Sequence, residues 1–418
     1  MHIVFVTVEL ATRENPSGGL ATFTANMARL FHRHGHDVDI ILVTTKEQNL
    51  IFDTGIKVHN IYVPKNEWEV YDYIAGLDSS SEEERRDKRL GLMYMYKSHM
   101  VKALIDRMHE HNPIDIVHLC NHGACSLFFD NTIPYVIRIS GFLNIWFFGG
   151  DTINGSLKYK DNPESYRQKL EILSMKNAPN VIAPSNLLAK IAGEELRIPT
   201  DVIESPFVFD HDSWNYDAYE KIIRDANGRY ILFYGTMSIL KGISVIAELA
   251  EKLLRRNRDL RLVLCGRDTV INVGDGILAS DYVKEKAADF SDRVIYAGQL
   301  TREYLYPVIN GAELVILPSR IENLSNACIE AMAMGKIVVA TDGASYEQLI
   351  DDGVSGFLCK RDNPDDYLDA IERGLNLNKD EKDRMIQEAK NRISELEPNK
   401  VYQRFYDYYK KVIAEWNF

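Results

Sequence analysis

Short apolar segments recur along this chain, and each leads into a turn and a segment with helical patterning. The first, His2–Val8, is rich in β-branched residues and shows no alternation of apolar and polar positions. Such a run is expected of a strand that is buried on both faces of a parallel sheet. Further strands, some with the turn that follows, are expected at Asp37–Val43, Ile114–Leu119, Tyr135–Ile139, Val181–Ser185, Tyr230–Tyr234, Leu262–Arg267, Val294–Leu300 and Leu314–Leu317. The alternation of strands and helices predicts an α/β fold with doubly wound sheets.

The length of 418 residues exceeds what one hydrophobic core usually holds, so two domains are expected. Residues 205–228 are polar and carry no periodic pattern, which indicates a linker. The net charge of −12 argues against a nucleic-acid-binding protein, because phosphates would repel such a surface.

The cysteines are scattered and indicate a reducing compartment. They are odd in number, five in all, and none has the spacing of metal ligands. The first apolar run is too short to span a membrane and no basic leader precedes it, so we expect a strand rather than a signal peptide. No later run is long enough to cross a bilayer. Together these features predict a cytoplasmic protein.

The stretch Pro318–Gly335 carries the chemistry of the second half. Its polar loop holds Glu322, a short helix capped by Ser325 or Asn326 holds Glu330, and Gly335 can end that helix. The free N–H groups of a helix N-terminus favour an anion such as a diphosphate. A ligand with hydroxyls at both ends and phosphate in the middle, such as a nucleotide sugar, suits this arrangement. The alternative is a surface helix with two unrelated glutamates.

Two glutamates separated by seven residues, with Pro-Ser before them and Glu-Ala-Met-Ala-x-Gly around the second, resemble the signature of glycosyltransferase family 4. These are retaining enzymes of the GT-B fold, in which two Rossmann-like domains face each other across a cleft. The resemblance implies an acceptor-binding domain at 1–204, a nucleotide-sugar-binding domain at 205–398, and a last helix, 399–418, that packs back on the first domain. It places Glu322 against the donor sugar and Glu330 against the ribose, with Asn323, Leu324, Ser325 and Asn326 between them.

Other donor-binding residues follow from the resemblance. The family usually shows Gly-Arg with Lys-Gly six residues later, and here Gly235, Thr236 and Lys241 stand in that pattern. Because Thr236 stands where the family has a positively charged arginine, we expect Arg320 or Arg267 to supply the missing charge. Gly266, at the end of a predicted strand, is expected near the nucleoside base. In the first half, the glycine pair Gly18 and Gly19 is expected under the donor phosphates, and the alternative is an ordinary strand-to-helix turn.

The first domain is expected to hold the acceptor. Many family members carry His-x-His where the strand expected at Ile114–Leu119 ends, and here His118 keeps the first place while Cys120 stands at the second. We expect His122 to supply the imidazole, and the alternative is a loop histidine with local hydrogen bonds. After the next strand, Ser140, Phe142 and Trp146 open an aromatic segment. It either contacts the acceptor or packs on itself.

Two further patterns have both a functional and a structural interpretation. Asp37 and Asp39 superficially match the Asp-x-Asp metal site of another glycosyltransferase fold, but they lie in an apolar strand, so we expect no metal there. The helix expected at Lys88–His111 carries several lysines and arginines that would suit an anionic membrane, although neighbouring acids favour a solvated face.

The predicted activity is the metal-independent, retaining transfer of a hexose-type sugar from a nucleotide diphosphate sugar, with uridine as the expected base, to a hydroxyl. The predicted catalytic residues are Glu322, Lys241 and His122, and no cofactor is expected beyond the sugar nucleotide as co-substrate. The acceptor is a glycan, a lipid-linked sugar, a protein or a small molecule, with peripheral membrane contact as one option. The alternatives are a catalytically silent GT-B subunit and a sugar-nucleotide epimerase or hydrolase.

Overall fold

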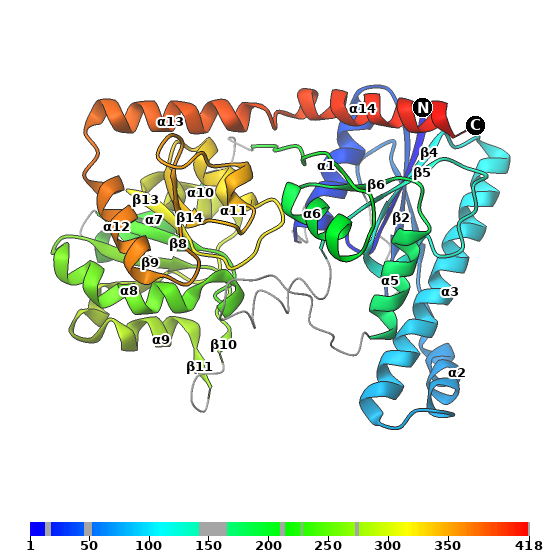
Figure 1. Cartoon of the computed structure of the whole chain (residues 1–418), viewed down its shortest axis with the longest axis horizontal. Helices are drawn as coiled ribbons and strands as arrows, with labels where there is room; N and C mark the ends of the chain where they lie inside the picture. The colour runs from blue at the N-terminus through cyan, green and yellow to red at the C-terminus, as the bar shows by residue number, and fades with distance from the viewer. Residues whose placement is uncertain are drawn as a thin grey trace. The chain divides into compact units, whose positions relative to one another are not determined.

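The computed structural model describes residues 1–12, 18–45, 52–141, 165–209, 214–226, 229–271 and 276–416. The chain forms two compact units. The described residues of the first lie within Met1–Asn144, Tyr159–Pro206 and Glu397–Phe418, and those of the second within Phe207–Leu396. Each unit has its own parallel sheet with helices against it (Figure 1). The predicted α/β class with two Rossmann-like domains is therefore confirmed.

The sheet of the first unit has seven strands in the order β3-β2-β1-β4-β5-β6-β7. All pairs are parallel, and the first strand, β1, is buried along its whole length, as its apolar run predicts. The strands are β1 (His2–Thr7), β2 (Asp37–Val43), β3 (Lys57–Ile61), β4 (Ile116–Cys120), β5 (Tyr135–Arg138), β6 (Val181–Ala183) and β7 (Asp201–Val202). The helices of this unit are α1 (Gly19–Arg33), α2 (Lys65–Gly76), α3 (Glu82–His111), η1 (His122–Ala124), α5 (Tyr166–Lys176), α6 (Asn186–Glu195) and α14 (Pro398–Glu415).

The C-terminal helix α14 belongs to the first unit, and its apolar stripe explains why. Val401, Phe405, Tyr409 and Val412 are buried in one core cluster with residues of β1, α1 and β2. These positions recur every three or four residues, so they lie on one face of the helix.

The sheet of the second unit has six strands in the order β12-β9-β8-β13-β14-β15. Its strands are β8 (Tyr230–Tyr234), β9 (Arg261–Cys265), β12 (Val294–Tyr296), β13 (Leu314–Leu317), β14 (Ile337–Thr341) and β15 (Phe357–Cys359), with a separate pair β10 (Val270–Ile271) and β11 (Ile277–Leu278). The helices are α7 (Asp217–Ala226), η2 (Ile239–Lys241), α8 (Ile243–Arg256), α9 (Ala279–Lys286), η3 (Ala288–Arg293), α10 (Arg302–Gly311), α11 (Asn326–Ala333), η4 (Tyr346–Gln348), α12 (Pro364–Leu375) and α13 (Lys379–Ser394).

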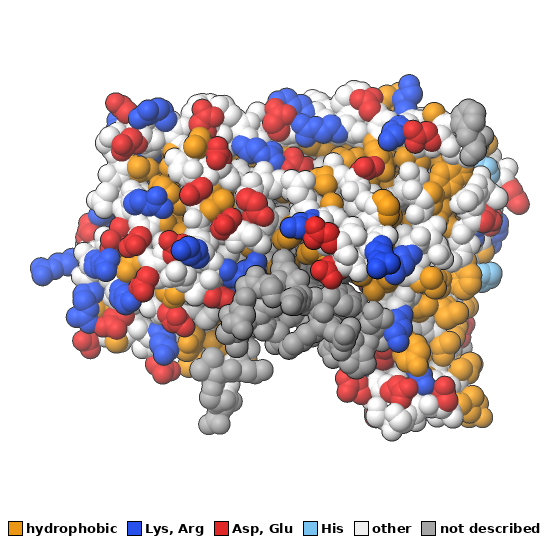
Figure 2. Space-filling view, viewed as in Figure 1, with side chains coloured by type: hydrophobic (Ala, Val, Ile, Leu, Met, Phe, Trp, Pro, Cys, Tyr) orange, Lys and Arg blue, Asp and Glu red, His pale blue; other side chains and the backbone are white. Residues whose placement is uncertain are grey.

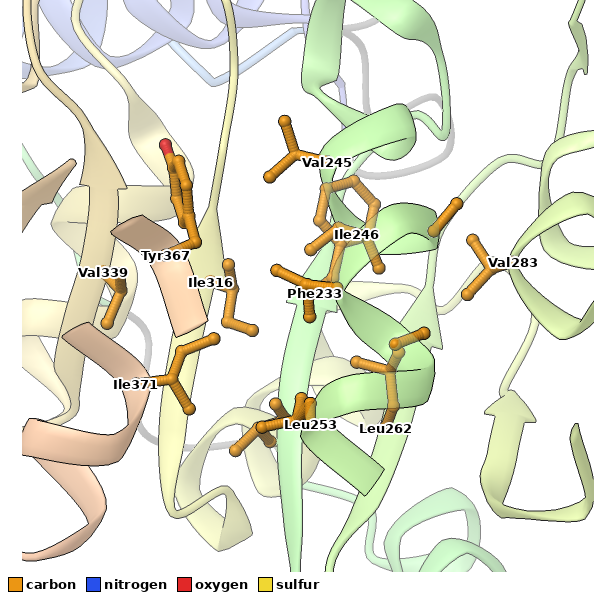
Figure 3. Packing of buried hydrophobic residues seen from close by; sticks show 14 of the residues in the cluster. Phe233, Val245, Ile246, Leu253, Leu262, Val283, Ile316, Val339, Tyr367 and Ile371 are labelled. Carbon is orange, nitrogen blue, oxygen red and sulfur yellow. The ribbon is translucent and has the colours of Figure 1, made fainter. Parts of the chain in front are cut away.

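Two apolar clusters cover the faces of this second sheet. One contains residues of α8, α9 and α12, and the other contains residues of α10, α11 and α13. Figure 3 shows the first cluster, in which Phe233 and Ile316 of the strands pack with Ile246 and Leu253 of α8. Both faces of the sheet are thus buried, as near-continuous apolar strands require.

Two sequence-based boundaries were wrong. Helix α3 begins at Glu82 rather than near Lys88, because Ser81 caps it by accepting the N–H of Glu84, and three acids in the first turn favour its positive end. The segment expected to be a linker, 205–228, contains α7 and also contributes Phe207 and Phe209 to the packing of the second core.

Charges of both signs are interspersed on the face of the molecule shown in Figure 2. The basic residues of α3 are largely paired: Lys88 Nζ lies 3.0 Å from both Asp78 and Glu84, and Lys102 Nζ lies 2.7 Å from Asp106. This pairing favours the solvated-face interpretation of α3. In the part of the chain that the structure describes, no helix is at once long enough and apolar enough to cross a membrane.

Candidate active site

The site of the second unit lies where its strand order reverses. From β8 the chain adds β9 and β12 on one side of the sheet, and from β13 it adds β14 and β15 on the other. Strands β8 and β13 are parallel neighbours, so the loops at their carboxyl ends flank the switch point. Ligands of open α/β sheets bind at such points. These loops are Gly235–Gly242 and Pro318–Ser325, the two segments that the sequence singles out.

Gly242 brings the two loops together. Its φ is +76°, and a Cβ atom there would lie 1.9 Å from the carbonyl oxygen of Pro318. Only glycine permits this approach. The N–H of Arg320 donates to the carbonyl of Leu240 at 2.8 Å, which fixes the same contact. The loop that carries Lys241 is therefore held against the loop that carries Glu322.

The side chains of Lys241 and Glu322 form an ion pair with an Nζ–Oε1 distance of 2.5 Å. Ser319 Oγ donates to the same Oε1 at 2.8 Å, and Tyr346 OH lies 3.4 Å from it. The Glu322 side chain is 11% exposed and that of Lys241 30%. All three donors meet on Oε1, and no described residue donates to Oε2, which leaves this oxygen available to a ligand hydroxyl.

The residues between the two glutamates form the turn into α11. Ser325 is the helix cap and accepts the N–H of Cys328, as predicted, while Asn326 is exposed on the first turn. Leu324 packs into the core, so only its backbone can face a ligand. The carbonyl of Asn323 accepts a 2.5 Å hydrogen bond from Ser345, whose φ is +80°. A left-handed non-glycine residue beside the loop is the kind of local strain that functional sites tolerate.

Glu330 is buried on α11, and its partners come from α10. Arg302 Nε lies 3.5 Å and Tyr306 OH 3.4 Å from its Oε1. Burial raises the pKa of the Glu330 carboxyl, and Arg302 and Tyr306 act in the opposite direction. The carboxylate is thus desolvated but supported by two donors. Sequence reasoning missed both, because nothing in a sequence links them to a glutamate 24 or more positions away.

The ends of the neighbouring strands complete this part of the site. Gly235 donates to the carbonyl of Cys265, and Gly266 donates to that of Gly298, each at 2.9 Å. Met237 donates to the carbonyl of Arg267, which places Thr236 and Arg267 on adjacent extended segments.

The two candidate replacement cations differ. Arg267 is exposed and has no ion pair with any residue that the structure describes. Arg320 Nε lies 2.8 Å from Asp362 Oδ1, and the Arg320 side chain is 12% exposed. The geometry therefore favours Arg267 as the free cation beside Thr236.

In the first unit, Gly18 and Gly19 lie at the start of α1 and are exposed. Gly18 is the N-cap and provides no side-chain cap. The first turn of α1 is therefore open to an anion, which is compatible with the predicted phosphate contact.

His118 does not lie where an acceptor could reach it, contrary to the sequence-based expectation. It is 3% exposed, its Nδ1 lies 2.6 Å from Tyr409 OH, and its ring packs among Phe5, Phe23 and Phe405. Burial lowers its pKa to about 3, so the ring is neutral at neutral pH. The histidine is a packing residue between β4 and the C-terminal helix.

His122 follows β4 at the switch point of the first sheet, between β1 and β4. Its side chain is 28% exposed, and burial lowers its pKa. Its Nδ1 lies 3.9 Å from Glu171 Oε1, which accepts the N–H of Gly123 at 2.9 Å. Burial raises the pKa of Glu171 to about 7. The thiol of Cys120 is buried and donates to the carbonyl of His122, so it supports the turn rather than facing solvent.

Ser140 lies beside this turn, half-buried at the end of β5. Its N–H donates to Asn121 Oδ1 at 2.8 Å, and Arg138 Nη1 donates to its hydroxyl at 3.0 Å. Asn121 and Glu171 are residues that sequence reasoning missed. The sequence offered no signal for Glu171, because the buried face of α5 also carries the polar residues Gln168 and Ser174. Phe142 and Trp146 lie outside the described residues.

Asp37 and Asp39 lie at the start of β2, where Asp37 is exposed and Asp39 is buried. His2, Asp37 and Asp39 bring one potential metal ligand atom each within 4.8 Å. The carboxylate of Asp39 nevertheless has both oxygens engaged, by His2 Nε2 at 2.9 Å and His59 Nε2 at 3.0 Å. Burial raises the pKa of Asp39, but the hydrogen bonds from His2 and His59 outweigh it and lower the pKa.

Comparison with known proteins agrees with this geometry. Residues 217–392 match the family described as glycosyl transferases group 1. Over 146 residues the chain is 34% identical to alpha-D-kanosaminyltransferase of Streptomyces kanamyceticus, a match that covers 35% of this chain and 36% of that protein. The chain thus spans about a third of that relative's length. It is 25% identical over 390 residues to the uncharacterized glycosyltransferase MJ1607 of Methanocaldococcus jannaschii, covering 90% of this chain and 89% of the relative.

Solved structures show the same fold. Sucrose-phosphate synthase from Thermosynechococcus elongatus superimposes with a TM-score of 0.70 at 16% identity, covering 99% of both chains. Anabaena HepE in complex with UDP superimposes with a TM-score of 0.65 at 16% identity, covering 98% of this chain and all of that one. The fold is therefore that of the GT-B glycosyltransferases. Fold and family match together indicate an enzyme of the glycosyltransferase class.

Proposed function

We propose that this chain transfers a hexose-type sugar from a nucleotide diphosphate sugar to a hydroxyl acceptor, with retention of anomeric configuration. The observation that carries the proposal is the Lys241–Glu322 pair at the switch point of the second sheet. It joins a cation suited to a leaving phosphate with a carboxylate oxygen suited to sugar hydroxyls. A nucleotide sugar offers both partners, because its phosphate is attached to the anomeric carbon and hydroxyls are attached to the neighbouring ring carbons.

The proposed chemistry follows from the charges. Breaking the bond between the anomeric carbon and the leaving oxygen places negative charge on the diphosphate, which Lys241, Arg267 and the first turn of α8 are suited to stabilise. Glu322 Oε2 accepts hydrogen bonds from the transferred sugar. The leaving phosphate oxygen takes the acceptor proton as the new glycosidic bond forms on the same face. Charge stabilisation by side chains is the basis for proposing a metal-independent reaction.

We propose uridine diphosphate as the leaving group. The support is the likeness of this fold to HepE, whose structure contains UDP, together with Glu330, whose carboxylate would accept from the ribose. The acceptor contacts are proposed for the first unit. There His122 and Ser140 come together after β4 and β5, joined through Asn121 and the turn that Glu171 supports.

One alternative has a specific observation in its favour. In the pattern of the resembled family, Thr236 stands in place of Arg, Cys120 in place of His and Phe207 in place of Asn, as they would in a catalytically silent subunit. Against this stands the intact Lys241–Glu322 pair, which such a subunit has little reason to keep. An epimerase or hydrolase would consume donor with no acceptor present.

The deciding experiment incubates the protein with UDP-, GDP- and ADP-sugars and a panel of hydroxyl acceptors. Product mass identifies transfer, and the anomeric coupling constant in the NMR spectrum reports the configuration. We expect a product with the donor's configuration. An inverted product would disprove the retaining mechanism, and donor loss without acceptor would indicate the epimerase or hydrolase. Absence of nucleotide binding in calorimetry would favour the silent subunit.

A further inference from the structure

A phenol and a guanidinium from α10 point at the buried carboxylate of α11. Tyr306 OH and Arg302 Nε both approach Glu330 Oε1, at 3.4 and 3.5 Å. As with Glu322, the donors meet on one oxygen, and no described residue donates to the other. A buried carboxylate without donors would favour the neutral form or another rotamer, so these two groups decide where its second oxygen points.

The Tyr306 side chain is itself held in place by aromatic packing. It is 2% exposed, its ring stacks on Phe209 with a centroid distance of 5.2 Å, and Trp214 packs edge-on at 6.4 Å. Phe209 belongs to the second unit and precedes α7, and its ring also packs with that of Phe207 at a centroid distance of 5.8 Å. These aromatic contacts hold the Tyr306 ring.

Arg302 differs from Tyr306 because its side chain is 54% exposed, on the first turn of α10. One side of Glu330 is therefore fixed by a buried, neutral donor and the other by a solvent-accessible cation. A ligand that enters this region meets a carboxylate whose orientation is already set, which reduces the entropy lost on binding.

We infer that Tyr306 and Arg302 are positioning residues for nucleotide binding: they hold Glu330 so that its free oxygen accepts a hydrogen bond from a ribose hydroxyl. This inference rests on the proposed function. It goes further because it assigns the recognition of the hydroxyl to three residues. Glu330 contacts the ligand, and Tyr306 and Arg302 act on the ligand only by orienting Glu330. It also assigns the Phe209 stack a role in ligand recognition.

The test compares ligands with and without the hydroxyl. Calorimetry first identifies which of UDP, GDP and ADP binds the wild type, and then measures the 2′-deoxy and 3′-deoxy forms of that nucleotide. We expect removal of the recognised hydroxyl to weaken wild-type binding about tenfold. In Tyr306→Phe, which keeps the ring and its stack, we expect the parent nucleotide to bind several-fold more weakly and the penalty for the missing hydroxyl to shrink. Arg302→Met should act in the same direction.

Tyr304→Phe is the matched control, because it makes the same change two positions away on the same helix. Its hydroxyl makes no hydrogen bond with a described residue, so binding and the deoxy penalty should equal those of the wild type. Circular dichroism and the thermal midpoint check that each variant is folded. An unchanged deoxy penalty in folded Tyr306→Phe and Arg302→Met would overturn the inference while leaving the proposed function intact. Failure of the wild type to bind any of the three nucleotides would overturn both.

Discussion

Lys241 Nζ lies 2.5 Å from Glu322 Oε1, although 81 positions separate the two residues in the chain. The contact joins the loop after β8 to the loop after β13. Because these two strands are neighbours at the switch point, the pair stands where a doubly wound sheet is open to ligands.

Replacing Glu322 by glutamine should lower sugar transfer without unfolding the protein. The glutamine side chain has no negative charge. At the position of Oε2 it places either an NH2 group, which cannot accept a hydrogen bond, or an amide oxygen, which accepts more weakly than a carboxylate. We expect kcat/KM to fall about 10- to 100-fold, the range for a lost hydrogen bond to a charged group. The control is Glu251→Gln on the surface of α8. Equal rates in both variants would remove Glu322 from the proposed mechanism.

Replacing Lys241 by methionine should weaken binding of the diphosphate selectively. We expect the dissociation constant of UDP to rise about tenfold and that of UMP to rise less, because the second phosphate carries the lost charge contact. Titration calorimetry measures both. Lys252→Met, on the exposed face of α8, is the control with the same change in net charge. An equal rise in the dissociation constants of UDP and UMP would show that Lys241 does not contact the second phosphate.

Arg267→Met should also weaken UDP binding, while Arg258→Met, in the loop at the opposite end of β9, should not. The reason is that Arg267 is an exposed cation beside Thr236, whereas Arg320 is already paired with Asp362. We expect a several-fold loss for Arg267→Met at low salt, and a smaller loss at high salt because exposed charges are screened. If Arg320→Met weakens binding more than Arg267→Met does, the assignment of the replacement cation is wrong.

Gly242→Ala should destabilise the protein more than Gly343→Ala. Both glycines have positive φ, +76° and +71°, so both alanines have the same backbone strain, about 1–2 kcal/mol. Only at Gly242 does the new Cβ also meet the carbonyl oxygen of Pro318, at 1.9 Å, whereas Gly343 has open space. We expect the additional loss in unfolding free energy to be about 2 kcal/mol. Equal denaturant midpoints would show that the two loops are not held together there.

Glu171→Gln should change how stability depends on pH. Burial raises the pKa of Glu171 from 4.5 to about 7, so between these values the folded state binds more protons than the unfolded state. Unfolding free energy should therefore fall as pH rises from about 4.5 to 7, and the contribution should level off above 7. Glutamine cannot ionise, so the variant should lose this slope and gain about 3 kcal/mol relative to wild type at pH 8.

The control for that experiment is Glu194→Gln, which removes an exposed glutamate on α6. Its unfolding free energy should follow the wild-type pH profile, measured by denaturant titration from pH 4.5 to 8. A Glu171→Gln profile parallel to wild type would show that this carboxyl is ionised in the folded protein throughout the range.

Sequence reasoning reached most strands of the two sheets, the two-domain fold and the loop from Pro318 to Asn326, because continuous apolar runs and capping residues are local signals. It missed β3 (Lys57–Ile61), whose short sequence mixes polar and apolar residues. It failed for His118, which lies in a core with Tyr409. The sequence around a histidine in a motif position is the same whether or not the C-terminal helix covers its side chain. It also missed α7, a ten-residue helix in which apolar residues such as Tyr219 and Ile222 are interspersed with charged ones, and whose neighbour Phe209 packs on Tyr306 of α10.

The sequence by itself determined which segments become buried parallel strands, where the turns with glycine follow them, and which residue types stand in those turns. Each of these depends on interactions within a few positions of the chain. Only the tertiary structure decided which charges meet. Strand order placed Lys241 on Glu322, paired Arg320 with Asp362 while Arg267 has no such partner among the described residues, and set Tyr306 and Arg302 on Glu330. Such pairs depend on which strands become neighbours, and that is settled by burying both faces of each sheet at once.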